Sequence, residues 1–367
     1  MAAATAYAQA NPFTPVFGKV PPYMAGRELI IEDMVQAFET GGANPDLCTI
    51  FVGARGTGKT ALLTYLGFCA QRSGWIVADT TASDDMLEDI LERAKAAAAH
   101  LIPDDASTHL SSVNIGSLGG ISWDHTPAEA NWRTKMSSLL DQLSDTKTGL
   151  VITVDEIDGS INQMVELVTT YQHFVREGRN VALLMAGLPY KVSALLSGKT
   201  TSFLRRAARR TLGSIPSYEV KEAFRLTVED GGKKIGNDAL DVASNAIAGF
   251  PFMFQLVGYR SWNAARQSGE ITCEHVRQGV EIAREEFEHR VLAATFAELS
   301  KGDVAFLKAM NAQGITTREQ LAQRTGKKSS YISTYKKRLL EAGVIDEENA
   351  GEFTFALSGM GEYVRTQ

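Results

Sequence analysis

The chain has 367 residues, of which 44% are hydrophobic and 22% charged, and its formal net charge is −6. This length exceeds one ordinary domain and suits two or three domains with cores of their own. The negative balance excludes a wholly basic nucleic-acid coat, so any contact with DNA would have to come from a local patch.

The cysteines and the N-terminus point to a cytoplasmic protein. Cys48, Cys69 and Cys273 are far apart and lack a metal-ligand spacing, which favours buried structural residues in a reducing compartment. The start MAAATAYAQANPF has no basic stretch followed by an apolar core, and no later run reaches the roughly 18 apolar residues of a membrane span. We therefore expect neither a membrane span nor a membrane partner.

In chain order, the first element is an arm over residues 1–25. Four prolines lie between Pro12 and Pro22, and they favour extended backbone over a folded domain. The next stretch, GRELIIEDMVQAFETGG, has apolar residues at helical spacing and ends in glycines, so it predicts a helix.

Strands and helices then alternate through a domain expected over residues 26–216. The predicted strands are LCTIFVG, WIVADT, GLVITVDE and VALLMAG, and the predicted helices are 59–71, 84–101, 129–143 and 160–178. Nearly continuous apolar strands between amphipathic helices predict an α/β fold with a parallel sheet covered on both faces. Residues 104–130 interrupt this alternation as a hairpin or loop insertion, to which we assign no chemistry.

Two smaller domains are expected after the sheet. Residues 217–299 carry only helical patterns, without a strand signal, and predict a helical lid. Residues 300–367 read as three helices followed by two short strands around GVIDEENAGEFTFAL. Three helices and a hairpin form the layout of a winged helix-turn-helix.

The stretch GARGTGKT, residues 53–60, has the glycine spacing of a phosphate-binding loop. Such a loop needs glycines where backbone amides approach an anion, a lysine for the outer phosphates, a hydroxyl for the metal and a helix start. The motif lies between a predicted strand and a predicted helix, which is the context it requires. The residues expected to hold the nucleotide are Gly53, Arg55, Gly56, Thr57, Gly58, Lys59, Thr60 and Ala61.

A second part of the site is expected where LVITVDE ends. Four apolar strand residues surround Thr153 and lead to Asp155 and Glu156. In phosphoryl-transfer sites, an acid after a strand holds Mg²⁺ and a second acid polarises the attacking water. We therefore expect Thr60 and Asp155 beside Mg²⁺, with Glu156 as the catalytic base of an ATPase.

The order of phosphate loop, acidic strand end, arginine-bearing segment, lid and winged helix resembles the AAA+ ATPases. It is most similar to the branch that contains the archaeal and eukaryotic origin-recognition initiators and their bacterial relatives, which neighbours the STAND signalling ATPases. The resemblance runs from about Gly26 to the end of the chain. It implies replication initiation, mobile-element maintenance or a related chromosomal task.

The resemblance also implies roles for two further segments. AGRE at 25–28 is similar to a motif that lies against the adenine, which implies base-side roles for Gly26 and Arg27; a plain helix start with Glu28 in its first turn is the alternative. FLRRAARR at 203–210 falls where the family has its arginine finger, which would stabilise charge on a neighbouring subunit's ATP. The residues concerned are Arg205 and Arg206, with Arg209 and Arg210 as further choices, and a basic surface is the alternative.

Two features depart from the typical AAA+ pattern. The strand VALLMAG ends in Ala186 and Gly187, where many AAA+ proteins have a polar residue that orients water. GFP at 249–251 resembles a motif of STAND ATPases and implies that Pro251 lies near the base; a helix stop followed by a proline restart also explains it. The strand end implies slow turnover, and the two features together imply a site that senses the nucleotide as much as it hydrolyses it.

The segment GKKSSYISTYKKRLL contains five cations and no acid. Positive charge concentrated on one helix, with short polar residues near its start, is typical of a DNA-recognition helix. A winged helix can also bind proteins, and late lysines can serve only the helix dipole. The expected DNA contacts are Lys327, Lys328, Ser329, Ser330, Tyr331, Lys336, Lys337 and Arg338.

Together these patterns predict an ATP-dependent protein that binds duplex DNA, and the resemblance implies a homo-oligomer in which an arginine is supplied in trans. The alternative is a STAND-like signalling switch whose winged helix binds a protein. A metabolic P-loop enzyme fits less well, because no second substrate motif is present and the tail would be unexplained.

Overall fold

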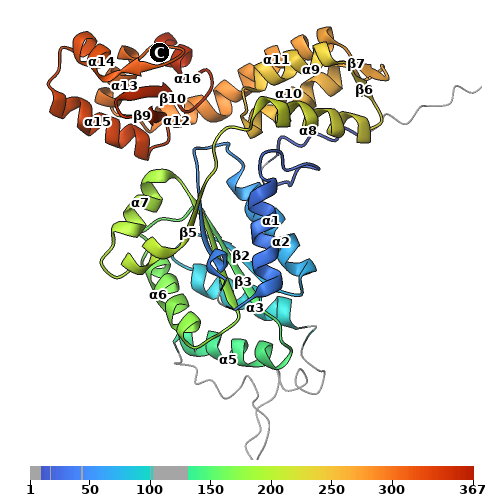
Figure 1. Cartoon of the computed structure of the whole chain (residues 1–367), viewed down its shortest axis with the longest axis vertical. Coiled ribbons are helices and arrows are strands. Elements are labelled where there is room, and N and C mark those ends of the chain that lie inside the picture. Colours follow the sequence, from blue (N-terminus) through green and yellow to red (C-terminus); the bar gives the residue numbers. More distant parts are fainter. Residues whose placement is uncertain (1–9, 17, 43, 100, 102–130) are drawn as a thin grey trace, which may run out of the picture.

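The computed structural model describes residues 10–16, 18–42, 44–99, 101 and 131–367 (Figure 1). The insertion predicted at 104–130 lies outside these residues. Among the residues described, no helix combines the length and the hydropathy that a membrane crossing would require.

Five strands form the central sheet. They are β1 (Cys48–Val52), β2 (Ile76–Thr81), β3 (Leu150–Asp155), β4 (Val181–Gly187) and β5 (Ala208–Thr211). Their order is β2-β3-β4-β1-β5, and every neighbouring pair is parallel. All seven residues of β4 are buried, as expected for a central strand covered on both faces.

Helices cover both faces of the sheet. One core contains residues from α3 (Met86–Ala98), α5 (Trp132–Asp145), α6 (Asn162–Arg176) and α7 (Pro189–Ser197). The core on the other face contains residues from α1 (Glu28–Thr40) and α2 (Lys59–Arg72). Two short 3-10 helices, η1 (Pro45–Leu47) and η3 (Ser202–Arg206), precede β1 and β5. The predicted α/β fold with a parallel P-loop sheet is therefore confirmed.

The lid consists of α8 (Ser217–Asp230), α9 (Asn237–Ile247), α10 (Pro251–Ala264) and α11 (Cys273–Phe287). The expectation of helices alone is wrong, because β6 (Lys234–Ile235) pairs in parallel with β7 (Glu270–Ile271). Two-residue strands are too short to leave an alternating pattern in the sequence. A π-helical turn, η4 (Glu288–Leu292), and α12 (Ala293–Ala297) extend α11 towards the C-terminal domain.

The C-terminal domain contains the three predicted helices, α13 (Lys301–Ala309), α14 (Arg318–Thr325) and α15 (Ser329–Glu341), and the predicted hairpin, β9 (Ile345–Asn349) and β10 (Glu352–Phe355). The strand β8 (Thr316–Thr317) pairs with β10, and α16 (Met360–Thr366) ends the chain; the sequence analysis anticipated neither. Figure 1 shows this domain and the lid side by side across one end of the sheet domain.

Candidate functional site

The phosphate loop connects β1 to α2 in a conformation that depends on its glycines. Gly56 and Gly58 have φ values of 79° and 85°, in the left-handed region that favours glycine. A Cβ atom on Gly53 would lie 2.5 Å from Thr57 Oγ1. Side chains at these positions would therefore distort the loop, and the backbone is free to approach an anion at the start of α2.

Lys59 is buried at the centre of this loop. Its Nζ donates hydrogen bonds to the carbonyl oxygens of Gly53 and Ala54, at 3.0 and 2.9 Å. Burial lowers the pKa of this amine, while the nearby carboxylates of Glu156 and Asp155 act in the opposite direction. Among the residues that the structure describes, the direct hydrogen-bond partners of the ammonium group are these two neutral carbonyl oxygens.

Thr60 and Asp155 meet at the junction of α2 and β3. The hydroxyl of Thr60 donates to Asp155 Oδ2 at 2.5 Å, although the two residues are far apart in sequence. A hydroxyl and a carboxylate oxygen in contact form the kind of hard-oxygen pair that suits Mg²⁺. The residues present therefore fit the predicted metal site.

Glu156 occupies a strained position at the end of β3. Its φ is 52°, which is uncommon for a residue other than glycine. Its backbone amide donates to Asp155 Oδ1 at 2.8 Å, and its side chain is exposed and lines the adjoining cavity. Glu156 therefore borders the same space as Lys59 and Thr60, which is compatible with its predicted role as a water-activating base.

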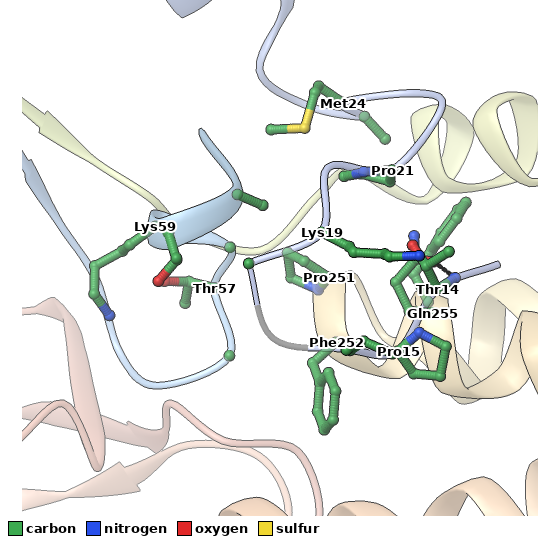
Figure 2. Close-up of a pocket in the computed structure, with 18 of the residues that line it drawn as sticks. Thr14, Pro15, Lys19, Pro21, Met24, Thr57, Lys59, Pro251, Phe252 and Gln255 are labelled. Carbon is green, nitrogen blue, oxygen red and sulfur yellow. Dashed lines mark hydrogen bonds between the residues drawn. The ribbon is translucent and has the colours of Figure 1, made fainter. Parts of the chain in front are cut away.

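A cavity of about 570 Å³ lies between the phosphate loop, the lid and the N-terminal arm (Figure 2). The predicted site residues that line it are Arg27, Arg55, Gly56, Thr57, Gly58, Lys59, Thr60, Ala61, Glu156 and Pro251. Gly26, Gly53 and Asp155 are not part of the lining. Most of the predicted nucleotide residues therefore converge on one space large enough for a nucleotide.

Several cavity residues were missed by the sequence analysis. The arm contributes Thr14, Pro15, Val16, Gly18, Lys19, Pro21, Tyr23, Met24 and Ala25, and the lid contributes Phe252, Phe254, Gln255, Arg290 and Val291. The prolines of the arm signalled extended backbone, but no local pattern showed where that backbone would pack. Arg290 is held by an ion pair with Glu286 at 2.9 Å, so the lid also brings a cation to this cavity.

Arg27 is buried and bonded to backbone carbonyls. Its guanidinium donates to Gly213 at 2.9 Å and to Gly26 at 3.0 Å, with a longer contact of 3.5 Å to Thr57. Burial lowers its pKa. Arg27 therefore joins the phosphate loop to the segment between β5 and the lid, while its side chain still borders the cavity.

The residues predicted to supply an arginine finger do not line this chain's own cavity. Arg205 and Arg206 are exposed in η3, and Arg205 donates to the carbonyl of Leu196 at 3.1 Å. Arg210 lies in β5 and forms ion pairs with Asp33 and Asp46. An exposed position on η3 is compatible with reaching another subunit, which stays a prediction.

The start of α15 presents an exposed polar surface. Lys327, Lys328, Ser329 and Ser330 are all exposed. Arg318, which the sequence analysis missed, donates to the hydroxyls of Ser329 and Ser333 at 2.6 and 2.8 Å. Tyr331 is half-buried, with its ring 4.4 Å from that of Tyr335.

The later cations of α15 have acidic partners within the domain, and their expected contact with DNA stays a prediction. Lys336 lies 2.7 Å from Glu347, and Arg338 lies 2.8 Å from the buried Asp303. Lys337 remains exposed, 3.8 Å from Glu341. These acids come from outside the basic segment, so a count of charge within the segment could not include their neutralising effect.

The C-terminal domain touches the phosphate loop directly. Arg55 forms an ion pair at 2.7 Å with Glu298, which lies at the end of α12, immediately before this domain. Gly343, just after α15, is so close to the loop that an added Cβ would lie 3.3 Å from Ala54 Cα. A second cavity, of about 380 Å³, lies at this contact and is lined by residues of the loop, α7, α12 and α15. The end of α15 is thus docked beside the nucleotide cavity.

Comparisons with known proteins establish the fold. The Walker-type ATPase PABY2304 of Pyrococcus abyssi is 14% identical, with 95% of this chain and 100% of that chain covered and a TM-score of 0.65. The ORC2 protein of Aeropyrum pernix in ADPNP–ADP complexes is 16% identical, with 96% of each chain covered and a TM-score of 0.60; its ADP form gives 0.53. The chain therefore has a P-loop AAA+ fold similar to that of these two proteins.

The sequence comparisons match a smaller part of the chain than the structural comparisons do. A family model described as a domain of unknown function (DUF8462) matches residues 289–364, which cover the C-terminal domain as far as Val364 in α16. A search of curated proteins finds no match.

Proposed function

We propose that the chain binds and slowly hydrolyses ATP, and that it engages duplex DNA through a C-terminal winged helix-turn-helix in a nucleotide-dependent way. The observation that carries this proposal is that the phosphate loop borders the nucleotide cavity and also contacts the segment that leads into the C-terminal domain. Arg55 lines the nucleotide cavity and also pairs with Glu298, immediately before the C-terminal domain. A ligand in the cavity and the position of the C-terminal domain are therefore linked through one short loop.

Nucleotide binding is supported by the chemistry of the loop. The glycine backbone, the Lys59 ammonium and the start of α2 offer donors and positive charge to phosphates. Thr60 and Asp155 would hold Mg²⁺, which would neutralise phosphate charge when bound. A protein of the same fold, Aeropyrum pernix ORC2, has been solved in ADPNP–ADP complexes.

Hydrolysis would depend on Glu156, whose exposed carboxylate accepts a proton from water at the cavity. The end of β4 supports slow turnover, because its last residues, Ala186 and Gly187, are buried and offer no polar side chain that could orient water. Arg205 or Arg206 of a neighbouring subunit would add positive charge, so turnover would rise on assembly.

DNA engagement is supported by the start of α15. Lys327 and Lys328 are exposed before the helix, and Ser329 and Ser330 open it. Lysines there would contact phosphates, and the short hydroxyl side chains would face phosphates or base edges. Lys336 and Arg338 would instead stabilise the domain, because they are paired with Glu347 and Asp303.

The test is fluorescence anisotropy of a labelled duplex titrated with the protein, with ATP, with ADP and without nucleotide. We expect salt-sensitive binding with different affinities in ATP and ADP. Salt-sensitive binding that is identical in all three conditions would refute the nucleotide link and leave the DNA contact. Absence of binding in every condition would refute the DNA contact.

The second candidate function is a STAND-like switch whose C-terminal domain binds a protein. The pairing of Lys336 and Arg338 within the domain favours it, because it leaves α15 less basic than its sequence indicates. Nucleotide binding without any duplex binding would make this the leading function.

A further inference from the structure

Two arginines of the lid share one carboxylate. Glu286, near the end of α11, forms an ion pair with Arg260 of α10 through Oε1 and another with Arg290 of η4 through Oε2, the second at 2.9 Å. The Glu286 side chain is 18% exposed, whereas the Arg290 side chain is 47% exposed. Because one carboxylate cannot neutralise two guanidinium groups, these three side chains carry one positive charge in excess.

The packing of the lid holds Glu286 and Arg260 together. Beside Arg260, the helices α10 and α11 are in close contact, since a Cβ on Gly279 of α11 would lie 2.6 Å from the backbone nitrogen of Ser261. Phe13 of the N-terminal arm is buried against α10 as well. Arg260 does not line the nucleotide cavity. The pair of Glu286 with Arg260 is therefore a fixed part of the lid, away from any bound nucleotide.

Arg290 is the member of this cluster that borders the cavity. It lies with Val291 on η4, and both residues line the cavity. Such π-helical turns are rare and occur frequently at functional sites. The turn directly follows Phe287, whose ring centroid is 6.3 Å from that of Phe252. A Cβ on Gly56 would lie 3.5 Å from Phe252 Cβ, so these two rings join the turn that carries Arg290 to the phosphate loop.

Positive charge dominates the lining of the cavity. Among the described residues that line it, Glu156 is the only acid, and the cations are Lys19, Arg27, Arg55, Lys59 and Arg290. Figure 2 shows Lys19 beside Thr14 and Gln255, on the arm side of the cavity and away from Lys59. Arg27 is held by backbone carbonyls and Arg55 by Glu298. The cavity therefore suits a polyanion, and Arg290 is the cation that the lid adds to it.

We infer that Arg290 exchanges Glu286 for the outer phosphate of a bound nucleoside triphosphate, so that this ion pair sets how strongly the site prefers ATP to ADP. The exchange leaves Glu286 paired with Arg260, so it does not leave a largely buried carboxylate without a partner, which would be costly. The Arg290 guanidinium binds phosphate oxygens through paired N–H donors. ADP lacks the outer phosphate, so Arg290 stays with Glu286. This inference rests on the proposed binding of ATP at the phosphate loop.

The experiment is calorimetric titration of the full chain with ATP and with ADP. Arg290→Gln should weaken ATP binding about tenfold, which corresponds to one charge-assisted hydrogen bond, and should change ADP affinity by less than about twofold. Arg290→Lys keeps the charge without the paired donors and should show a smaller loss. The matched control is Arg284→Gln, an exposed arginine of α11 outside the cavity lining, which should leave both affinities unchanged.

Arg260→Gln tests the exchange itself, because Arg260 lies outside the cavity lining. Without Arg260, the departure of Arg290 would leave Glu286 unpaired, so Arg290 should be held more firmly. ATP affinity should then fall about threefold to tenfold, while ADP affinity should stay the same. In the Arg290→Gln chain, adding Arg260→Gln should cause no further loss of ATP affinity, because the ion pair to be exchanged is already gone.

The outcomes separate this inference from the proposed function. Equal losses of ATP and ADP affinity in Arg290→Gln, or no loss of either, would refute the role of Arg290 at the outer phosphate and leave the phosphate loop as the nucleotide site. Additive losses from Arg260→Gln and Arg290→Gln would refute the exchange with Glu286. Failure of the natural chain to bind either nucleotide would overturn the proposed ATP site and this inference with it.

Discussion

Arg55 Nη2 of the phosphate loop lies 2.7 Å from Glu298 Oε1, at the end of α12. Both side chains are partly exposed, and ion pairs of this kind contribute about 0–1 kcal/mol. A contact this weak suits a nucleotide-dependent rearrangement, because bound phosphates could compete with Glu298 for Arg55 at little cost to the stability of the chain.

Glu298→Gln should reduce the difference between DNA affinities in ATP and in ADP by about twofold to fivefold, since it removes the charge that holds Arg55. Anisotropy titrations of a labelled duplex measure this difference. Glu288→Gln, an exposed substitution on the same connecting segment, is the control and should leave it unchanged. An unaltered difference in Glu298→Gln would show that this ion pair does not transmit the nucleotide state.

ATP affinity should decline at alkaline pH earlier than an ordinary lysine would require. Burial lowers the pKa of Lys59 from its ordinary value of 10.5, so the attraction for phosphates is present below the lowered pKa and is lost as the pH rises through it. Titrations of ATP between neutral and alkaline pH measure the decline. Lys59→Arg stays protonated at alkaline pH, so its ATP affinity should change less over this pH range. Lys59→Ala should abolish ATP binding. If Lys59→Ala kept its ATP affinity, residues 53–60 would not be the phosphate-binding loop.

Glu156→Gln should bind ATP normally but release phosphate at least about 100-fold more slowly, because a carboxamide cannot accept the proton of the attacking water. Steady-state phosphate release and ATP titration of the same protein separate turnover from binding. If turnover persists, the base must be another residue.

Lys327→Ala combined with Lys328→Ala should weaken duplex binding and reduce the slope of log affinity against log salt by about two, one for each lost phosphate contact. The control pair, Lys199→Ala with Lys234→Ala, removes the same charge from exposed positions in the other domains. An equal effect of both pairs would indicate a general loss of charge and move the DNA contact away from α15.

Arg338→Ala should loosen the C-terminal domain. The substitution leaves Asp303, a buried carboxylate, without its ion-pair partner, which costs about 1–3 kcal/mol. Hydrogen exchange of α13 and α15 in the full chain should accelerate accordingly. Lys337→Ala, at an exposed neighbour, should have little effect, and equal exchange in the two variants would mean that the Arg338 pair is not structural.

The sequence predicted those parts of the site that are local. Residues 53–60 are contiguous, and the acids at 155 and 156 directly follow an apolar strand, so spacing alone predicts them; the structure brings Thr60 and Asp155 into contact. The fold class followed for the same reason, because alternating strands and helices leave a pattern within each element.

The parts that could not be predicted depend on contacts between distant segments. Glu347 and Asp303 neutralise cations of α15 from other elements, and no pattern within the basic segment reveals them. The arm was recognised as extended chain, but Phe13 finds its partners in the lid through tertiary packing. Two-residue strands such as β6 and β7 leave too little pattern to detect.

The burial of Phe13 also imposes an order on folding. Asn11 and Tyr259, which join the arm to α10, are 248 positions apart in sequence. A ribosome makes the arm first, and Phe13 has no complete pocket until α10 has been synthesised. The sheet domain can form its core earlier, since domains commonly fold as units during synthesis. Closing so long a loop has an entropic cost that slows folding, so we expect the arm to be the last segment to pack into the lid core. The side of the nucleotide cavity that the arm lines would form only at that stage.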